Sequence, residues 1–389
     1  MNKENKGKKK KAGWQQLFSL AIMILTGAVC GIFVISHLEL TGASELPFAE
    51  LLAFLGLIVG VYIALFFHII VHEAGHLVFG LATGYKFCSF RVGSLIWVKE
   101  GGKIRFKRLS LVGTGGQCLM APPEIKDGKM PLALYNLGGA ILNTVVGAVF
   151  AVLYAVYPYI PFLSPLLIML AAIGFMTAVI NGVPMRLGTI DNDGYNAFAI
   201  SRSKEAVEAF RIQLKVVEQT SRGVRVKDMP AEWFTLPSDE AMNNSMVATR
   251  AVFAANRLMD EGRLEDADAL MAHLLEIESG IVGLHRDLMS CDRITIELLG
   301  ECRAELIEGM LTPALKKFMR AMKRYPTVLR TEYALALLKD RDGERARVLK
   351  DDFEKAARTY PYPQELDSER ELLRLIEDRA AEPALNGKG

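Results

Sequence analysis

Long runs without charged residues dominate the first half of the chain. Residues 12–38 and 51–72 contain no Lys, Arg, Asp or Glu, and 130–185 is a third and longer run of this kind. An α-helix needs roughly 20 apolar residues to cross about 30 Å of hydrocarbon. The longest run includes YPYIPFLSP at 157–165, whose three prolines indicate a reversal between two helices. The pattern therefore predicts four transmembrane helices.

Positive charge predicts which ends of these helices face the cytoplasm. The first 13 residues hold six lysines and 85–129 holds nine Lys and Arg, whereas the connections at 39–45 and 158–165 hold none. Short cytoplasmic connections are enriched in Lys and Arg. We therefore expect a multi-pass protein of the cell membrane, with its N-terminus and its C-terminal half in the cytoplasm. The alternative for the first run is a cleaved signal peptide, but the run is too long for one.

Residues 94–109, SLIWVKEGGKIRFKRL, have the pattern of two strands joined by Gly101-Gly102. The segment is basic and partly alternating, so we expect a small β-hairpin at the cytoplasmic surface of the membrane. Two roles are open for it. The hairpin binds lipid headgroups, or its exposed edge pairs with an extended peptide through backbone hydrogen bonds.

The chain after residue 203 has a helical pattern. In RLEDADALMAHLLEIE, apolar residues recur at helical intervals, which predicts an amphipathic helix. Similar segments begin at Thr312 and Glu344, and their Tyr-Pro ends, at 325–326 and 360–361, are 35 residues apart. This period suggests stacked helix pairs that resemble tetratricopeptide repeats and offer a concave surface to a protein partner. The alternative is an irregular helical bundle that only stabilises the protein.

These patterns together predict a mainly α polytopic membrane protein with four regions. They are a basic N-terminus with the first transmembrane helix at 1–46, a membrane core with the surface hairpin at 47–200, a helix with a proline-bounded linker at 201–240, and a cytoplasmic helical-repeat domain at 241–389.

Composition and charge change this picture little. Residues 1–185 hold 15 Lys and Arg against 8 Asp and Glu, and the second half is acidic, so the formal net charge of the chain is only +2. The lysine-rich start is explained by membrane orientation, and we expect no nucleic-acid partner. The five cysteines form no C-x-x-C pair, which argues against a disulfide framework or a thiolate zinc site.

The stretch HIIVHEAGHLVFG carries the pattern H-E-x-x-H inside an apolar run, at His72, Glu73 and His76. Residues four apart lie on the same face of a helix, so both histidines can ligate one metal ion. Glu73 lies about 100° round the helix from His72 and can reach a metal-bound water. Zinc lowers the pKa of its water toward 7, and the glutamate takes the proton. Because a glutamate in an apolar run is costly unless it serves a site, the pattern predicts zinc-assisted amide hydrolysis with one zinc per chain.

His68 also lies on this helix, four residues before His72. It is eight residues from His76, which is about 12 Å along a helix, whereas Zn–N bonds are about 2 Å. One metal ion therefore cannot bind both. We expect His68 to pack between helices or, as the alternative, to contact a residue that ligates the metal.

A catalytic zinc needs a third protein ligand, which must come from the same end of the membrane helices. NGVPMRLGTIDNDGYNAF at 181–198 supplies Asp191 and Asp193 just beyond the fourth apolar segment. The alternative is that these aspartates only form a turn and cap the helix that follows.

The motifs together resemble the site-2 protease family of intramembrane zinc metalloproteases. That family carries H-E-x-x-H on one transmembrane helix, G-x-x-x-N on another and Asn-x-x-Pro … Asp-Gly on a later one. The matches here are, in chain order, His72, Glu73 and His76, then Gly139 and Asn143, then Asn181 and Pro184, then Asp193 and Gly194. The small residues of the second motif permit close helix packing.

The resemblance covers residues 47–200 and implies a catalytic core of three helices, with the first helix as an addition. It implies that His72, His76 and the aspartate of Asp-Gly ligate zinc and that Glu73 is the catalytic base. Asn181 would help to stabilise the oxyanion, and Asn143 belongs to the expected catalytic set.

The chain departs from the family in the spacing of the last motif. The family usually has its aspartate eight residues after the asparagine, but here that position is Thr189 and Asp193 lies twelve residues after Asn181. We expect Asp193 to be the ligand because Gly194 follows it as in the motif, and Asp191 remains the alternative.

We therefore expect a zinc endopeptidase that cuts membrane-anchored proteins or peptides near the cytoplasmic face, with a helical domain that recognises or regulates them. One alternative is an H-E-x-x-H membrane protease of the prenyl-protein or quality-control type, which takes its third ligand from a glutamate. Another is a non-catalytic membrane scaffold that acts through its repeats. The Asp-Gly pair argues against the first, and Glu73 argues against the second.

Overall fold

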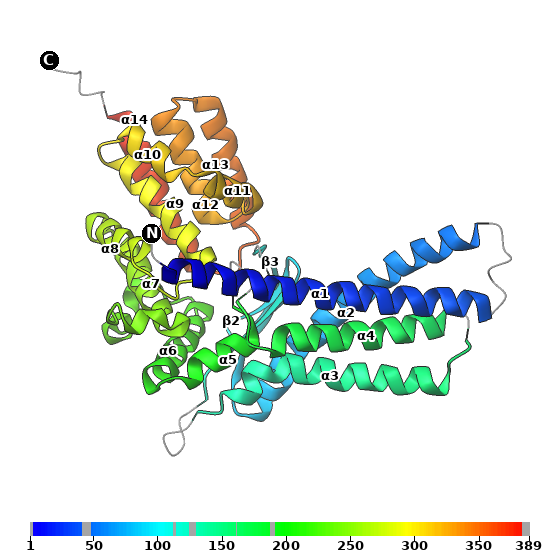
Figure 1. Ribbon diagram of the computed structural model, residues 1–389. Coiled ribbons are helices and arrows are strands. Elements are labelled where there is room, and N and C mark those ends of the chain that lie inside the picture. Colours follow the sequence, from blue (N-terminus) through cyan, green and yellow to red (C-terminus); the bar gives the residue numbers. More distant parts are fainter. Residues whose placement is uncertain are drawn as a thin grey trace. The chain divides into compact units, whose positions relative to one another are not determined.

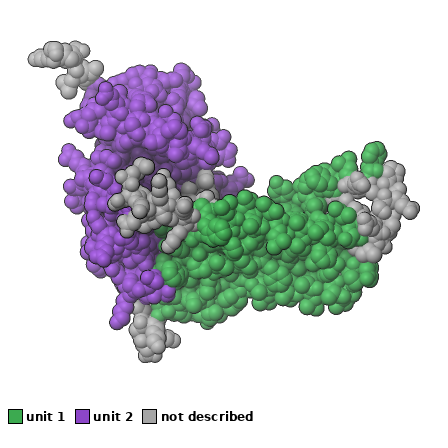
Figure 2. Space-filling model, viewed as in Figure 1, with its two compact units in different colours: residues 1–87, 115–199 green, residues 88–114, 200–389 purple. Residues whose placement is uncertain are grey.

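The computed structural model describes residues 3–40, 48–111, 114–123, 130–160, 162–186 and 191–382 (Figure 1). The chain divides into two compact units, residues 1–87 with 115–199 and residues 88–114 with 200–389 (Figure 2). Most of the connection at 39–45, and Thr189 in the last motif, lie outside the described residues.

Four long helices build the first unit: α1 (Lys3–Leu40), α2 (Ala49–Ala82), α3 (Ala133–Val156) and α4 (Leu163–Gly182). Each contains a segment long and apolar enough to cross a bilayer, at Gly13–Ser36, Phe54–Ala82, Ala133–Val156 and Leu163–Gly182. The short strand β4 (Gly116–Ala121) packs on α2, and helix α5 (Asp193–Ser201) follows α4. The prediction of four apolar helices, with a reversal between the last two, is confirmed.

Helices α2 and α3 approach each other closely beside the H-E-x-x-H motif. A Cβ on Gly75, which lies within the motif, would be 2.2 Å from the carbonyl oxygen of Gly138 on α3. Small residues allow the backbones of membrane helices to approach in this way. Large side chains on the outer side of α2, such as Ile63 and Phe66, are exposed, as expected where the surrounding solvent is hydrocarbon. Close packing therefore holds the motif against α3.

An antiparallel meander of three strands lies mainly in the second unit: β1 (Lys86–Val92), β2 (Leu95–Glu100) and β3 (Lys103–Arg108). Strands β2 and β3 pair from Leu95↔Arg108 to Glu100↔Lys103. Gly101 and Gly102 have φ of 56° and 80°, the left-handed conformation that a two-residue hairpin turn requires. The predicted hairpin is confirmed, whereas β1 and β4 are additional to the prediction.

One face of the hairpin packs into the helical core of the same unit. Ile96 and Val98, at alternate positions of β2, belong to one buried cluster with apolar residues of the C-terminal helices. The backbone N–H of Arg108, at the end of β3, donates to the carbonyl of Thr359 at 2.9 Å. The hairpin is thus joined to helices far along the chain. Its proposed roles in lipid or peptide binding stay predictions.

Helices α6 to α14 make up most of the described residues of the second unit (Figure 1). They are α6 (Lys204–Ser221), α7 (Ser245–Asp260), α8 (Leu264–Glu276), α9 (Gly283–Leu299), α10 (Ala304–Met310), α11 (Pro313–Ala321), α12 (Pro326–Ala334), α13 (Gly343–Ala357) and α14 (Pro363–Ala381). Three short 3₁₀ turns, Val226–Asp228, Ala231–Phe234 and Ala241–Asn243, connect α6 to α7, and the π turn Leu335–Lys339 continues α12.

The two Tyr-Pro pairs lie at corresponding points between helices. Pro326 opens α12, and Tyr360-Pro361 stands between α13 and α14. Proline is favoured at the first turn of a helix because its missing N–H has no intrahelical partner there. The rings of Tyr325 and Tyr360 meet edge-on with centroids 6.2 Å apart. The predicted helices are confirmed, and their arrangement as tetratricopeptide-like repeats stays a prediction.

Candidate metal centre

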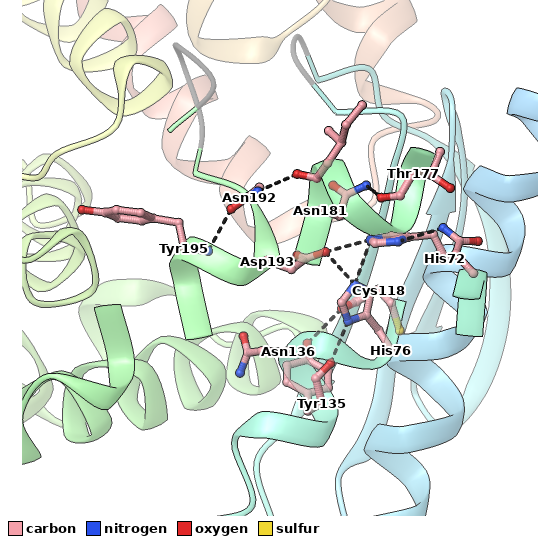
Figure 3. Close-up of polar contacts among 12 residues, drawn as sticks. His72, His76, Cys118, Tyr135, Asn136, Thr177, Asn181, Asn192, Asp193 and Tyr195 are labelled. Carbon is pink, nitrogen blue, oxygen red and sulfur yellow. Dashed lines mark hydrogen bonds and ion pairs between the residues drawn. The ribbon is translucent and has the colours of Figure 1, made fainter. Parts of the chain in front are cut away.

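The last turns of α2 present two histidines to the same point. His72 and His76 are one turn apart, both are buried, and their Nε2 atoms lie 3.2 Å from each other (Figure 3). Helical geometry produces this arrangement, because residues four apart share one face. Two imidazole nitrogens at this separation can ligate one ion.

The first residue of α5 supplies a carboxylate to the same point. Oδ2 of Asp193 lies 2.8 Å from Nε2 of His72 and 3.3 Å from Nε2 of His76 (Figure 3). The three ligand atoms lie within 4.8 Å of one another, and no other such group of metal-ligating side chains occurs in the described part of the chain.

The spacing of these three atoms fits a zinc ion. Zinc bonds to imidazole nitrogen and carboxylate oxygen are about 2.0–2.2 Å long, so the corners of the coordination tetrahedron are about 3.3 Å apart. The three separations observed here run from 2.8 to 3.3 Å. Three nitrogen and oxygen ligands with a fourth position for water are also the donor set of catalytic zinc sites.

The backbone of α3 fixes the ring of His76. Nδ1 of His76 donates to the carbonyl oxygen of Tyr135 at 2.7 Å, so Nε2 carries the lone pair that faces the site. The Tyr135 hydroxyl in turn donates to the carbonyl of Cys118 at 2.9 Å, and its ring stacks on that of Tyr85. A carbonyl that accepts from the other ring nitrogen is a common support for a metal-ligating histidine.

Two glycines make room for the reactive side chains. A Cβ on Gly116 of β4 would lie 2.5 Å from Oε1 of Glu73, and a Cβ on Gly139 of α3 would lie 2.4 Å from Cε1 of His72. Neither place accepts a larger residue without movement. The glutamate carboxylate therefore lies against β4, and the glycine of the G-x-x-x-N motif lies against an imidazole.

Comparison with known families decides what kind of protein carries this site. A sequence model of peptidase family M50, the site-2 protease family, matches residues 60–331. This chain belongs to peptidase family M50. It is therefore a membrane metalloprotease of the site-2 protease type. Neither the search of curated proteins nor the search of solved structures gave a match.

The two aspartates of this M50 protein have different partners. Oδ1 of Asp191 accepts from Nε of Arg186 at 3.0 Å, and the same two residues form an isolated backbone bridge. Asp193 instead reaches both histidines. The geometry therefore favours Asp193 over Asp191 as the third ligand. Residues 187–190, which lie between Asn181 and Asp193, are outside the described residues.

Asn181 lies at the end of α4, and its amide donates to the carbonyl of Thr177 one turn earlier at 2.9 Å. In the described residues this amide has no hydrogen bond to His72, His76 or Asp193. Its role in oxyanion stabilisation, which the resemblance implies, stays a prediction.

Asn192 is a site residue that the sequence motifs do not indicate. Its Oδ1 accepts from the backbone N–H groups of Met185 and Tyr195 at 3.0 and 2.8 Å. Its Nδ2 donates to two carbonyls near the end of α4, each at 2.6 Å. This buried side chain thus ties the end of α4 to the start of α5, where Asp193 lies. The signal available in the sequence is an asparagine directly before a helix, where such residues are favoured as caps.

Proposed function

We propose that this M50 protease is a zinc endopeptidase that cleaves membrane-anchored proteins or peptides near the cytoplasmic face. The observation that carries the proposal is the convergence of His72, His76 and Asp193, with Glu73 on the same helix. These residues would hold one zinc ion per chain. An aspartate as the third ligand argues against the class of membrane proteases that uses a glutamate there.

The residues around the site have distinct proposed tasks. A zinc ion bound there would lower the pKa of a water molecule and polarise the peptide carbonyl. Glu73 accepts the proton of the attacking water at its carboxylate and returns it to the leaving amine nitrogen. Gly116 keeps the space that this carboxylate occupies. Asn181 is proposed to donate to the oxygen that becomes negative. Asn143, which lies beside His72, is proposed to assist catalysis through its contact with that imidazole.

The position of the site on its helix supports cleavage near one face of the membrane. His76 lies within the apolar segment Phe54–Ala82, close to the end of α2. The charge pattern assigns that end to the cytoplasm. A site at this depth receives water from the cytoplasm and substrate from the bilayer.

The test compares the purified full-length protein with its Glu73→Gln variant. Both are expected to hold about one zinc by elemental analysis, because glutamine removes the base and leaves the three ligands. Proteolysis is expected to fall about 10²–10⁴-fold, the usual contribution of a general base. Membrane proteins that co-purify with the variant then supply substrates for the assay. Glu232→Gln, at an exposed glutamate of the second unit, is the control and should behave as wild type.

The proposal would be abandoned if neither protein holds zinc. It would also be abandoned if the variant cleaves a trapped protein as fast as wild type does.

We also propose that the N-terminus and helices α6–α14 lie in the cytoplasm and that these helices bind a protein partner or the substrate itself. The lysine-rich start and the recurring Tyr-Pro pairs support this proposal. A cysteine introduced at the exposed Ser238 should react with a membrane-impermeant maleimide only after cell lysis. Labelling of intact cells would contradict the orientation. If a trapped substrate forms cross-links to the protein but none to helices α6–α14, the binding role would be contradicted.

A further inference from the structure

A chain of polar contacts leads from the backbone of α4 to the imidazole of His72. His68, one turn before His72 on α2, is fully buried, and its Nε2 lies 2.7 Å from the carbonyl oxygen of Leu170. Its Nδ1 lies 3.1 Å from Oδ1 of Asn143, which is also fully buried. Nδ2 of Asn143 lies 3.3 Å from Nδ1 of His72. Three side chains from two helices therefore form one continuous path.

The Leu170 carbonyl determines where the hydrogens of this path lie. A carbonyl oxygen only accepts, so Nε2 of His68 carries a hydrogen, and in a neutral imidazole Nδ1 then accepts. A doubly protonated His68 would be a buried charge whose two polar partners, an amide and a carbonyl, are uncharged. Nδ1 of His68 must therefore face an N–H. The Asn143 amide supplies that N–H after a half-turn, which exchanges its oxygen and nitrogen at the same two positions.

The same half-turn decides the tautomer of His72. It places Oδ1 of Asn143 beside Nδ1 of His72, and this oxygen can only accept. His72 then carries its hydrogen on Nδ1 and directs the lone pair of Nε2 toward His76 and Asp193. This is the tautomer that a histidine needs in order to bind a metal ion through Nε2.

We infer that His68 is a positioning residue for the metal centre. Its Nδ1 holds the Asn143 amide in the orientation that prepares His72 to bind zinc. The Leu170 carbonyl, which accepts from its Nε2, fixes which nitrogen of His68 faces the amide. The inference rests on the proposed zinc function. It also assigns to His68 the contact with a ligand-supporting residue instead of packing alone.

The packing around His68 leaves its ring little freedom. A Cβ on Gly174 of α4 would lie 2.7 Å from Cε1 of His68, so α4 reaches the ring through a glycine. The ring of Phe67 also meets it edge-on, with centroids 5.3 Å apart. These contacts restrict the ring and keep its two nitrogens aimed at the amide and at the carbonyl.

Zinc affinity of the full-length protein in detergent, measured by competition with a chelator, tests the inference without any activity assay. His68→Leu removes both polar contacts and should weaken zinc binding by about 10-fold or more, within the 10–100-fold range typical of such supporting residues. His68→Gln keeps one donor and one acceptor and should stay within about threefold of wild type. His285→Leu, at a histidine of the second unit, is the matched control and should not change the affinity.

A second background separates positioning from a merely structural role. In Asn143→Asp both carboxylate oxygens accept, so His72 meets an acceptor in either orientation of the side chain. The negative charge of the aspartate also lets Nδ1 of His68 carry a hydrogen and donate to the other oxygen. In the Asn143→Asp variant, adding His68→Leu should lower the zinc affinity less than about threefold, whereas in wild type it should lower it 10-fold or more. Equal losses in the two backgrounds would overturn the inference, as would wild-type affinity in His68→Leu.

The remaining outcomes also decide. If His68→Leu is not recovered as a folded protein by gel filtration, Asn143→Asp should bind zinc like wild type and Asn143→Leu should bind about 10-fold more weakly. Equal weakening in those two variants would overturn the inference. Wild-type protein that binds no zinc would overturn the proposed function and this inference with it. Zinc-binding wild type with an unaffected His68→Leu variant would overturn the inference alone.

Discussion

Both units bury polar and charged side chains, but these side chains have different partners in the two units. In the second unit, called the helical unit below, Arg330 of α12 has no exposed surface and pairs with Asp292 of α9 and Glu369 of α14. Thr327 adds a hydrogen bond to the same glutamate. In the membrane unit, the buried histidines and a carboxylate aim their lone pairs at one point instead. The first group consists of opposite charges that pair with each other, and the second leaves its lone pairs available to a metal ion.

The comparison separates structural burial from functional burial. Burial raises the pKa values of the Asp292 and Glu369 carboxyls, and the charge of Arg330 opposes that change. Such a cluster connects three helices and requires no ligand. A buried ionisable group is therefore a poor indicator of function by itself. The better indicator is a set of ligand atoms that converge from separate elements and whose side chains are oriented by uncharged groups. At His76 and His72 these groups are a backbone carbonyl and the Asn143 amide.

The largest effect is expected when the converging group loses its carboxylate. Asp193→Asn replaces a negatively charged ligand by a neutral amide and should abolish zinc retention, because a catalytic zinc site needs its three protein ligands. Asp191→Asn is the matched control, since Asp191 bonds to Arg186 and should leave zinc bound. Zinc per protein after gel filtration is the measurement. Loss of zinc in Asp191→Asn, with retention in Asp193→Asn, would assign the ligand to Asp191.

A smaller effect, on stability alone, is expected in the helical unit. Arg330→Met leaves Asp292 and Glu369 without their cation and should lower the free energy of unfolding by about 3–5 kcal/mol. Arg347→Met removes an exposed ion pair with Glu344 and should cost less than about 1 kcal/mol. Urea unfolding gives the stabilities, and zinc affinity of the folded protein should remain unchanged in both variants.

The comparison between the units would fail if Arg330→Met were as stable as Arg347→Met. It would also fail if the folded Arg330→Met protein bound zinc more weakly than wild type.

Features that depend on local pattern could be predicted from the sequence. The four apolar helices follow from hydrophobic length, the hairpin from Gly101-Gly102, and the pairing of His72 with His76 from helical period. The order of the helices predicted Asp191 or Asp193 as the third ligand, and only the family motif favoured Asp193. A turn held by Asn192 brings Asp193 beside the histidines.

Other parts of the site have no side-chain signature. The carbonyls of Tyr135 and Leu170 orient His76 and His68, and a backbone oxygen is the same in every residue, so no sequence pattern indicates it. Strand β1 pairs with the adjacent β2, but no Gly-Gly turn marks their connection in the sequence. The position of β4 depends on packing with α2, which is distant in the sequence. The contact of the hairpin with the distant Thr359 could not be predicted for the same reason.

The smallest effect concerns Glu365 of α14, a partly buried carboxyl whose charged neighbours, Glu369 and Asp260, are acidic. Burial raises its pKa from the ordinary 4.5 to about 7, although the Tyr360 hydroxyl, which donates to Oε2 at 2.6 Å, acts to lower it. Because the folded pKa lies above the unfolded one, the folded state binds the proton more tightly. The stability that Glu365 contributes is complete below about pH 4.5 and is lost as the pH rises through about 7.

Glu365→Gln should remove that dependence, since a neutral amide has no proton to lose. Thermal unfolding midpoints of variant and wild type should agree at pH 4, and the variant should unfold at the higher temperature at pH 8. Tyr360→Phe is the complementary control: without the hydroxyl that stabilises the carboxylate, the loss of stability should extend to higher pH. If the curves of Glu365→Gln and wild type were parallel from pH 4 to pH 8, the pH dependence would belong to another group. Glu365, a partly buried carboxyl with acidic neighbours, would then no longer be an exception to the pairing of buried charges in the helical unit.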